Sequence, residues 1–436
     1  METLRFDLSK RGGNFKLLNA TNGGPLHKRY VPNAAKTNFE EYKAARIPYS
    51  RNHDSAASSF YGGPHAHDID MIFPYFDADE NDPASYDFEN TDECILCTLD
   101  AGTKTFFRLG QTIEHQLKKH GTLPPKNFKK WAVICEHIIR HYTEGWANGY
   151  TLDMPYWEIW NEPDLDPLPA THRRTWGGTD EEFFDLYEIT AKRLKSCFPH
   201  LKIGGPALAH RLDWAENFLS EMQKRGTPID FFTWHYYTRL PERVAEKSKT
   251  IQALLEKYGY GDAENILNEW GYVRGWGEQI IYSQEMMRGI KGAAYVMAVM
   301  SLAERSPIDM LMYYTTMLSA FNGVFDYYTF KPLKTYYVLK WYGMLYDMKH
   351  EVVCEDTLPN LYTLCGVNEE DKLTCIVTHF NESDLGESKD VHIDFGKEGV
   401  FEVYLLDEDN DATLLGEYTD LTFTMKRNSC LLIVEK

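Results

Sequence analysis

The sequence has no long apolar stretch. None of its windows approaches about 18 consecutive apolar residues, so no segment is expected to cross a membrane as a helix. A charged start followed by an apolar run is also missing, so a cytoplasmic protein without a signal peptide is predicted.

Basic residues are few, with 46 Lys and Arg against 65 Asp and Glu, which gives a net charge of −19. Phosphate backbones and anionic membranes need clustered Lys and Arg, so neither nucleic acid nor membrane is a predicted partner. A homo-oligomeric state stays open.

Metal and redox motifs are scarce as well. Cys94 and Cys97 form a C-x-x-C, but no second pair follows at the spacing of a zinc ribbon, and the segment looks helical. The eight cysteines are therefore expected to be reduced thiols, several of them in the core. One cluster combines residue types that ligate metals without fitting any zinc signature: His65, His67, Asp68 and Asp70. No metal and no organic cofactor is predicted, with a metal-dependent hydrolase using this cluster as an alternative.

The chain is longer than one barrel domain requires. A (β/α)8 barrel uses about 250 residues, and this chain has 436. A second domain is therefore expected. Hydrophobic and charged contents of 43% and 25% are ordinary for a globular enzyme. The aromatic content of 14% suits a sugar site and a large core equally well.

The central motif is Tyr-Trp-Glu-Ile-Trp-Asn-Glu-Pro at residues 156–163. Its aromatic and branched residues favour a packed strand, which Pro163 must end because it cannot donate to a ladder. Asn161 and Glu162 would then lie at the carboxyl end of a strand, where desolvation raises the pKa of a carboxyl and suits a general acid. The structural alternative is a glutamate that pairs with an Arg or caps the next helix.

A second stretch, residues 265–272, repeats this form around Glu269. Retaining glycoside hydrolysis needs two carboxyl groups, one to protonate the leaving oxygen and one to attack the anomeric carbon. Glu162 and Glu269 are 107 residues apart, which corresponds to about three strand–helix units of roughly 31 residues each.

Strands and helices alternate along most of the chain, which favours a parallel sheet, and eight units favour a closed barrel. The two motif stretches are the fourth and seventh strands, and the remaining strands are expected at 14–20, 46–52, 104–109, 201–205, 230–234 and 309–314. The helices are expected at 37–45, 91–101, 126–143, 180–197, 213–225, 243–258, 279–304 and 334–346.

Two segments depart from this rhythm. Residues 55–90, with glycine breaks and an acidic turn, are expected to form an inserted hairpin beside the site. Residues 347–436 show short alternating runs separated by Asp and Asn turns, which is typical of antiparallel β structure. The prediction is a (β/α)8 TIM barrel over residues 12–346, with a small accessory antiparallel β-sandwich formed by 347–436 and the strand in 1–11.

Several phrases, taken in order, resemble glycoside hydrolase family 39 of clan A, which includes β-xylosidases, α-L-iduronidases and arabinose-releasing enzymes. The resemblance covers about residues 12–345, and the phrases that carry it are Arg51 to His53, Glu158 to Pro163, Lys202 to Ala207 and Ala320 to Gly323.

The resemblance implies a role for each site residue. Glu162 is expected to be the acid/base and Glu269 the nucleophile of a retaining glycosidase, with Asn161 on the sugar 2-hydroxyl. His53 is expected at the non-reducing side of the sugar, His235 near the nucleophile, and Tyr237 is a weaker candidate there. For both histidines the alternative is a purely structural role.

Two departures bear on the substrate. Tyr314 stands where the β-xylosidases commonly have Trp, and their acidic pair after strand eight is not evident in 315–325. An arabinose-containing or other neutral plant sugar therefore fits at least as well as xylose. Tyr314 is expected to form the floor or a wall of a closed pocket that releases one or two sugars from the non-reducing end. The alternatives are a non-catalytic sugar-binding barrel and a glycone of another kind: galactose, glucose or uronic acid.

Overall fold

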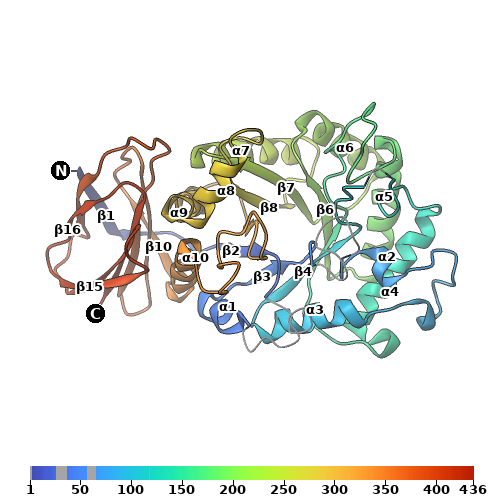
Figure 1. Ribbon diagram of the computed structural model, residues 1–436, viewed down its shortest axis with the longest axis horizontal. Coiled ribbons are helices and arrows are strands. Elements are labelled where there is room, and N and C mark those ends of the chain that lie inside the picture. The colour runs from blue at the N-terminus through green and yellow to red at the C-terminus, as the bar shows by residue number, and fades with distance from the viewer. Residues whose placement is uncertain (1, 26–36, 56–64, 117) are drawn as a thin grey trace.

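The computed structural model describes residues 2–25, 37–55, 65–116 and 118–436. Eight parallel strands close into a barrel, and a nine-stranded sheet lies beside it (Figure 1). The barrel strands follow one another in chain order: β2 (Leu17–Asn22), β3 (Tyr49–Arg51), β4 (Lys104–Leu109), β5 (Tyr156–Ile159), β6 (Lys202–Leu208), β7 (Phe231–Thr238), β8 (Glu264–Tyr272) and β9 (Met310–Tyr313).

Helices follow the barrel strands and cover the barrel's outside. This alternation confirms the predicted (β/α)8 barrel, because parallel neighbours need a crossover to return to the same edge. One helix begins at a capping box, in which Thr179 and Glu182 each accept from the other's backbone N–H. The helices are α1 (Phe39–Ala45), α3 (Glu89–Asp100), α4 (Phe128–Glu144), α5 (Asp180–Cys197), α6 (Leu212–Arg225), α7 (Pro241–Lys257), α8 (Ile280–Arg288), α9 (Ile290–Glu304) and α10 (Lys334–Met344).

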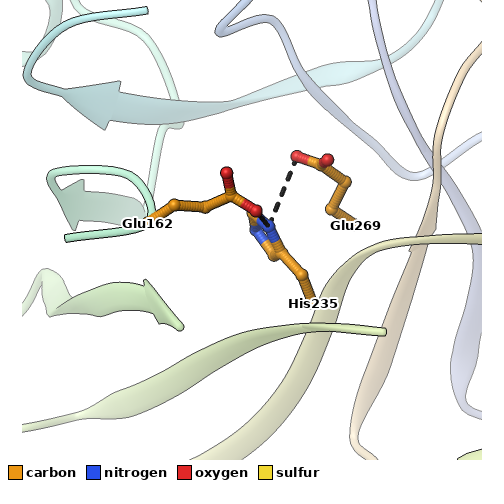
Figure 2. A group of neighbouring side chains, drawn as sticks. All are labelled: Glu162, His235 and Glu269. Carbon is orange, nitrogen blue, oxygen red and sulfur yellow. Dashed lines mark hydrogen bonds and ion pairs between the residues drawn. The ribbon is translucent and has the colours of Figure 1, made fainter. Parts of the chain in front are cut away.

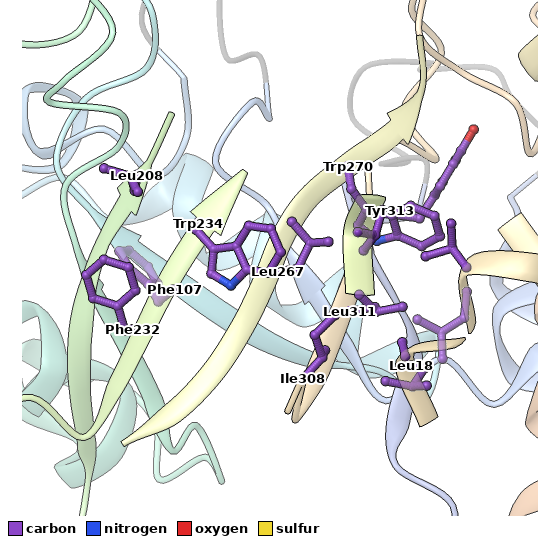
Figure 3. Close-up of a cluster of buried hydrophobic side chains, with 14 of the residues drawn as sticks. Leu18, Phe107, Leu208, Phe232, Trp234, Leu267, Trp270, Ile308, Leu311 and Tyr313 are labelled. Atoms are coloured by element: carbon purple, nitrogen blue, oxygen red, sulfur yellow. The ribbon is translucent and has the colours of Figure 1, made fainter. Parts of the chain in front are cut away.

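The period-2 alternation of the strands divides the barrel into an outer core and an inner one. Trp234, Leu267 and Trp270 belong to the large cluster between strands and helices (Figure 3). Phe231 and Ile266 belong to a separate cluster drawn from the other face of the strands, together with Ala20, Tyr49, Phe106, Tyr156, Met310 and Met312. The inward-facing positions further along the same strands carry the polar residues of the site.

The second sheet joins both ends of the chain. Its order is β15-β14-β17-β12-β11-β10-β1-β13-β16, and β1 (Glu2–Arg11) pairs antiparallel with β10 and parallel with β13. The other strands are β10 (His350–Cys354), β11 (Leu361–Val367), β12 (Leu373–His379), β13 (Lys389–Asp394), β14 (Phe401–Leu406), β15 (Thr413–Tyr418), β16 (Thr422–Met425) and β17 (Ser429–Glu435).

This sheet has a hydrophobic core of its own. Leu4 of β1 and Val403 of β14 belong to one cluster although several strands separate them in the sheet. The small β domain is thus a single curled sheet with one parallel pair, where a purely antiparallel arrangement was expected. Helix α9 packs between it and the barrel, against β11, β12 and β17 (Figure 1).

Two local predictions are wrong. The inserted hairpin is not formed by residues 65–90, which instead contain the one-turn helix α2 (Ile69–Ile72) and the 3-10 helix η1 (Pro83–Ser85); residues 56–64 lie outside the described part. Ile69 and Ile72 are spaced for one face of a helical turn, and both are buried. The helix expected at 279–304 is two helices, because Gly289 has an extended backbone between α8 and α9.

Within the described residues, no helix combines the length and the apolar character that a bilayer crossing requires.

Candidate active site

The carboxyl ends of the barrel strands bring the predicted site residues together. In parallel barrels this end carries the active site. Figure 2 shows Glu162, His235 and Glu269 pointing toward one another from three parts of the barrel. The whole predicted set gathers here: His53, Asn161, Glu162, His235, Tyr237, Glu269 and Tyr314.

Glu162 follows β5 on a sharply bent backbone. Its φ of 49° lies in the left-handed region, as does the φ of 75° at Trp160. For residues other than glycine such a backbone costs on the order of 1–3 kcal/mol and persists only where its surroundings hold it. Here the Glu162 N–H donates to Ala207 O at 2.9 Å, and the Thr175 hydroxyl donates to Glu162 O at 2.6 Å. The turn therefore presents the Glu162 carboxyl at a fixed place.

Glu269 is placed by an irregularity in β8. Trp234 pairs with Leu267, but the next residue of β7, His235, pairs with Glu269, so Asn268 is an extra residue on β8. Such a bulge re-aims the side chain that follows it. As a result Asn268 and Glu269 both point into the barrel. The Asn268 amide donates to Glu158 Oε1 at 2.6 Å, and Glu269 faces Glu162.

His235 lies between the two carboxyl groups. Its Nδ1 is 2.8 Å from Glu162 Oε1 and 3.5 Å from Glu269 Oε2 (Figure 2). The facing oxygens of Glu162 and Glu269 are within 4.8 Å of each other. Burial lowers the pKa of His235 below its ordinary value, which favours the neutral imidazole between the two acids.

The two carboxyl groups titrate far above their ordinary range. Burial, and then the charge of Asp164, raises the pKa of Glu162 to about 8. Burial also raises the pKa of Glu269, to about 7; Glu162 adds to this effect, while His235 and Arg51 oppose it. On these values Glu269 ionises first, and Glu162 keeps its proton to higher pH, because a second negative charge nearby is unfavourable.

Arg51 is the cation of the site, and sequence reasoning gave it no role. Its side chain is fully buried on β3 and donates to Glu158 Oε2 at 2.7 Å and to Asn161 Oδ1 at 2.7 Å. Its Nη1 reaches Glu269 Oε2 at 3.5 Å. A charged residue in a short buried strand was the available signal, but a sequence does not reveal which carboxylates face it.

Asn161 is oriented by this arginine. Because its Oδ1 accepts from Arg51, its Nδ2 must point elsewhere. That amide nitrogen is buried and has no hydrogen-bond partner among the residues that the structure describes. A buried donor without a partner is costly, so Asn161 holds a donor ready for a ligand oxygen.

Aromatic residues lie next to Glu269 and Asp54. The Tyr237 hydroxyl donates to Glu269 Oε1 at 2.6 Å, and the Tyr314 hydroxyl donates to Asp54 Oδ2 at 2.7 Å. Tyr314 has its ring centroid 6.3 Å from that of Tyr237 and 6.4 Å from that of His53. Tyr314 thus lies beside two other residues of the predicted site, and its role as floor or wall of a pocket stays a prediction. Burial and the charge of Arg51 lower the pKa of His53 to about 3, so His53 is neutral.

Trp276 stands at the rim. Its side chain is 59% exposed, and its ring lies 5.2 Å from that of Tyr237 and 5.9 Å from that of Phe321. A large aromatic residue this exposed is uncommon on a protein surface. It offers a flat apolar face next to the polar centre.

Asp68 of the predicted cluster is used by the protein itself, since its Oδ1 accepts from Arg108 at 2.8 Å and from the Thr112 N–H and hydroxyl, each at 2.8 Å. Among the described residues, the one group of three such side chains close enough to hold an ion is Glu162, His235 and Glu269.

Fold and site together define a class of protein. It is a (β/α)8 barrel in which two buried glutamates, on the fourth and seventh barrel strands, face each other. The sequence profile described as "Glycosyl hydrolases family 39" matches residues 64–264. The resemblance to glycoside hydrolase family 39 is thereby confirmed.

Individual relatives agree with this family. A beta-xylosidase of Caldicellulosiruptor saccharolyticus is 32% identical over 164 residues, which are 35% of this chain and 31% of that protein. A beta-xylosidase of Geobacillus stearothermophilus is 31% identical over 160 residues, 36% of this chain and 29% of the other. The chain spans about a third of the length of the curated relatives it matches.

A solved structure supports the fold. The crystal structure of a glucosidase from Croceicoccus marinus aligns with a TM-score of 0.81 at 19% identity, covering 100% of this chain and 99% of that one. At this identity the likeness concerns the architecture, including the sheet beside the barrel.

Proposed function

We propose that the protein is a retaining glycoside hydrolase in which Glu269 is the nucleophile and Glu162 the acid/base. The observation that carries the proposal is the facing pair itself, two buried carboxyl groups whose nearest oxygens are within 4.8 Å. Retaining enzymes separate their carboxyl groups by about 5–5.5 Å, whereas inverting enzymes need roughly 6.5–9.5 Å to admit a water.

In the first step the Glu269 carboxylate attacks the anomeric carbon, while Glu162 gives its proton to the leaving oxygen. Arg51 and Tyr237 contact the attacking carboxylate at 3.5 Å and 2.6 Å and favour its ionised form. Burial keeps the proton on Glu162 near neutral pH, which matches the task of an acid. The free Nδ2 of Asn161 would donate to the sugar 2-hydroxyl.

In the second step Glu162, now a carboxylate, removes a proton from water, and the water displaces Glu269 from the sugar. The pKa of Glu162 then has to fall while the glycosyl-enzyme exists. The pKa falls because Glu269 carries no charge once it is esterified, so it no longer repels a negative charge on Glu162. The net configuration at the anomeric carbon is retained.

The proposed substrate is a short plant-derived oligosaccharide with arabinose or xylose at its non-reducing end, released one or two sugars at a time. The names of the two curated relatives support a pentose. The wall formed by Tyr314 and Phe321 supports a pocket that takes a chain end. All eight cysteines are free thiols, which supports a reducing compartment such as the cytoplasm.

The decisive experiment compares two variants on an aryl pentoside with a good leaving group. Glu269→Ala should abolish turnover, and added azide should restore part of it with inverted product, because the small anion enters the space of the carboxylate. Glu162→Ala should keep a fast first step on the same substrate, since a good leaving group needs little protonation.

A matched control is Glu246→Ala, whose carboxylate forms only an exposed ion pair with Arg243; it should behave like the wild type. Wild-type turnover in Glu269→Ala without azide would contradict the proposal. So would a wild-type enzyme that is active on no aryl pentoside or hexoside, which would favour a non-catalytic sugar-binding barrel.

A further inference from the structure

Asp54 is a carboxylate of the site that neither the motifs nor the mechanism uses. It follows His53 directly after β3, and its side chain is 14% exposed. Its Oδ2 accepts a 2.7 Å hydrogen bond from the Tyr314 hydroxyl and lies 3.2 Å from His53 Nε2. The hydrogen bond from Tyr314 favours the ionised form of the Asp54 carboxyl, and the pKa of Asp54 lies below its ordinary value. Asp54 therefore brings a fixed negative charge into the pocket.

The position of Asp54 relative to the reacting carboxyls is set by His53. One nitrogen, His53 Nε2, is 3.2 Å from Asp54 Oδ2 and 3.6 Å from Glu269 Oε2. Asp54 and Glu269 therefore flank the same imidazole nitrogen. A sugar whose anomeric carbon sits between Glu162 and Glu269 would bring its more distant hydroxyls toward this carboxylate.

The charges around Asp54 leave the pocket negative. The charge of Asp54 raises the pKa of both Glu162 and Glu269. Burial lowers the pKa of His53 and of His235, which favours the neutral form of each imidazole. Arg51 is the cation that faces Glu269, and it is already paired with Glu158 at 2.7 Å.

Two further groups near Asp54 bear on its charge. Tyr314 keeps its proton, because burial raises the pKa of its hydroxyl. Arg108 donates through Nη2 to Asp68 at 2.8 Å and to the His53 carbonyl at 2.9 Å, while its Nε and Nη1 have no hydrogen-bond partner among the described residues. Asp54 therefore offers a negatively charged hydroxyl acceptor on this wall.

We propose that Asp54 recognises the glycone, because its carboxylate accepts a hydrogen bond from a ring hydroxyl remote from the anomeric carbon. The same negative charge excludes sugars that carry a carboxylate at that end. This inference rests on the proposed function and names its substrate class, a neutral glycone rather than a hexuronide. A site built to accept from a hydroxyl rejects an analogue that leaves the acceptor unpaired, and like charges at close range add to the rejection.

The test is Asp54→Asn, which keeps shape and removes charge, assayed on an aryl β-D-xyloside and an aryl β-D-glucuronide, each at the pH optimum of the variant. Loss of a hydrogen bond to a charged group corresponds to roughly a 10- to 150-fold fall in kcat/KM on the xyloside. The ratio of glucuronide to xyloside kcat/KM should rise at least about tenfold, because the repulsion is gone. Asp77→Asn, which loses only a surface ion pair with Lys126, is the matched control.

A second measurement separates recognition from a structural role. If Asp54 accepts from a sugar hydroxyl, the penalty of Asp54→Asn should largely vanish on the 3-deoxy or the 4-deoxy aryl xyloside, whichever lacks the hydroxyl that Asp54 binds. An equal loss on all substrates with an unchanged glucuronide ratio would overturn the inference about Asp54 and leave the proposed function intact. A wild-type protein that hydrolyses no aryl pentoside or hexoside would reject the proposed function itself.

Discussion

The Tyr237 hydroxyl donates a 2.6 Å hydrogen bond to Oε1 of Glu269. The two residues lie on the adjacent strands β7 and β8. Tyr237 pairs with Gly271, and Glu269 pairs with His235. This bond favours the ionised form of a carboxyl whose pKa burial has raised to about 7. On the proposed mechanism Tyr237 therefore acts through Glu269, as a positioning residue that favours the charged form of the proposed nucleophile.

Tyr237→Phe should lower kcat/KM most strongly at acid pH. Without the hydroxyl the pKa of Glu269 rises, so the acid limb of the pH profile should move upward by about one to two pH units, the equivalent of one hydrogen bond to a charged group. Tyr236→Phe is the control, because Tyr236 packs on Lys247, with the ammonium 4.5 Å from its ring centroid. An unshifted acid limb in Tyr237→Phe would show that the bond has no such role.

The wild-type pH profile should be narrow and centred just above neutrality. Glu269 must be ionised, which requires a pH above about 7, and Glu162 must be protonated, which requires a pH below about 8. The limbs of kcat/KM belong to the coupled pair rather than to single residues. In Glu162→Gln the alkaline limb should disappear on a substrate with a good leaving group. A broad optimum near pH 5 would contradict this reading of the site.

Much of this site follows from local sequence. Strands that end in Asn161-Glu162-Pro163 and in Glu269 predict carboxyl groups at the carboxyl edge of a barrel, and their spacing predicts a gap of about three strand–helix units. The family resemblance adds His53, His235 and Tyr237, which also lie at strand ends.

The other features of the site depend on the register between neighbouring strands, which local sequence does not reveal. Strict alternation along β8 would send Asn268 and Glu269 to opposite faces, and only the bulge between Leu267 and Glu269 lets both serve the interior. Arg51 and Glu158 form a buried ion pair across the barrel at 2.7 Å, and no local pattern identifies such partners. The hairpin expected within 55–90 is not formed by 65–90, because Ile69 and Ile72 bury one face of a helical turn there.

A cluster of ion pairs joins the strand of the nucleophile to the second sheet. The Tyr272 hydroxyl at the end of β8 donates to Glu382 at 2.8 Å, and Arg274 contacts Glu382 at 2.7 Å and Asp384 at 3.2 Å. Lys291, only 5% exposed, lies 2.8 Å from Asp384. Glu382 and Asp384 belong to the loop between β12 and β13, so the sheet beside the barrel holds the segment that leads to Trp276.

Removing the center of this cluster should cost both stability and substrate affinity. Glu382→Ala leaves the nearly buried Lys291 with fewer partners, and we expect unfolding in denaturant to become easier by about 1–3 kcal/mol. KM for an oligosaccharide should rise more than KM for an aryl glycoside, because the Trp276 rim loses its support. Glu246→Ala, at an exposed pair, should change stability by less than about 1 kcal/mol. Equal stability of the two variants would argue against a structural link.

The last prediction concerns where a polymer is cut. A barrel's loops set the depth of its site, and here Tyr314, Phe321 and Trp276 form a continuous aromatic wall, with neighbouring ring centroids 6.0 Å and 5.9 Å apart. Asp54 accepts a 2.7 Å hydrogen bond from Tyr314 at one end of this wall, and we expect the glycone to lie at that end. A site closed at that end accepts only a chain terminus, so arabinan or xylan should yield mono- and disaccharides from the earliest time points. Chromatography of an early digest checks this directly, with Glu269→Ala as the blank. A spread of medium-length fragments at low conversion would mean internal cleavage, and it would require the wall to open along the length of the chain.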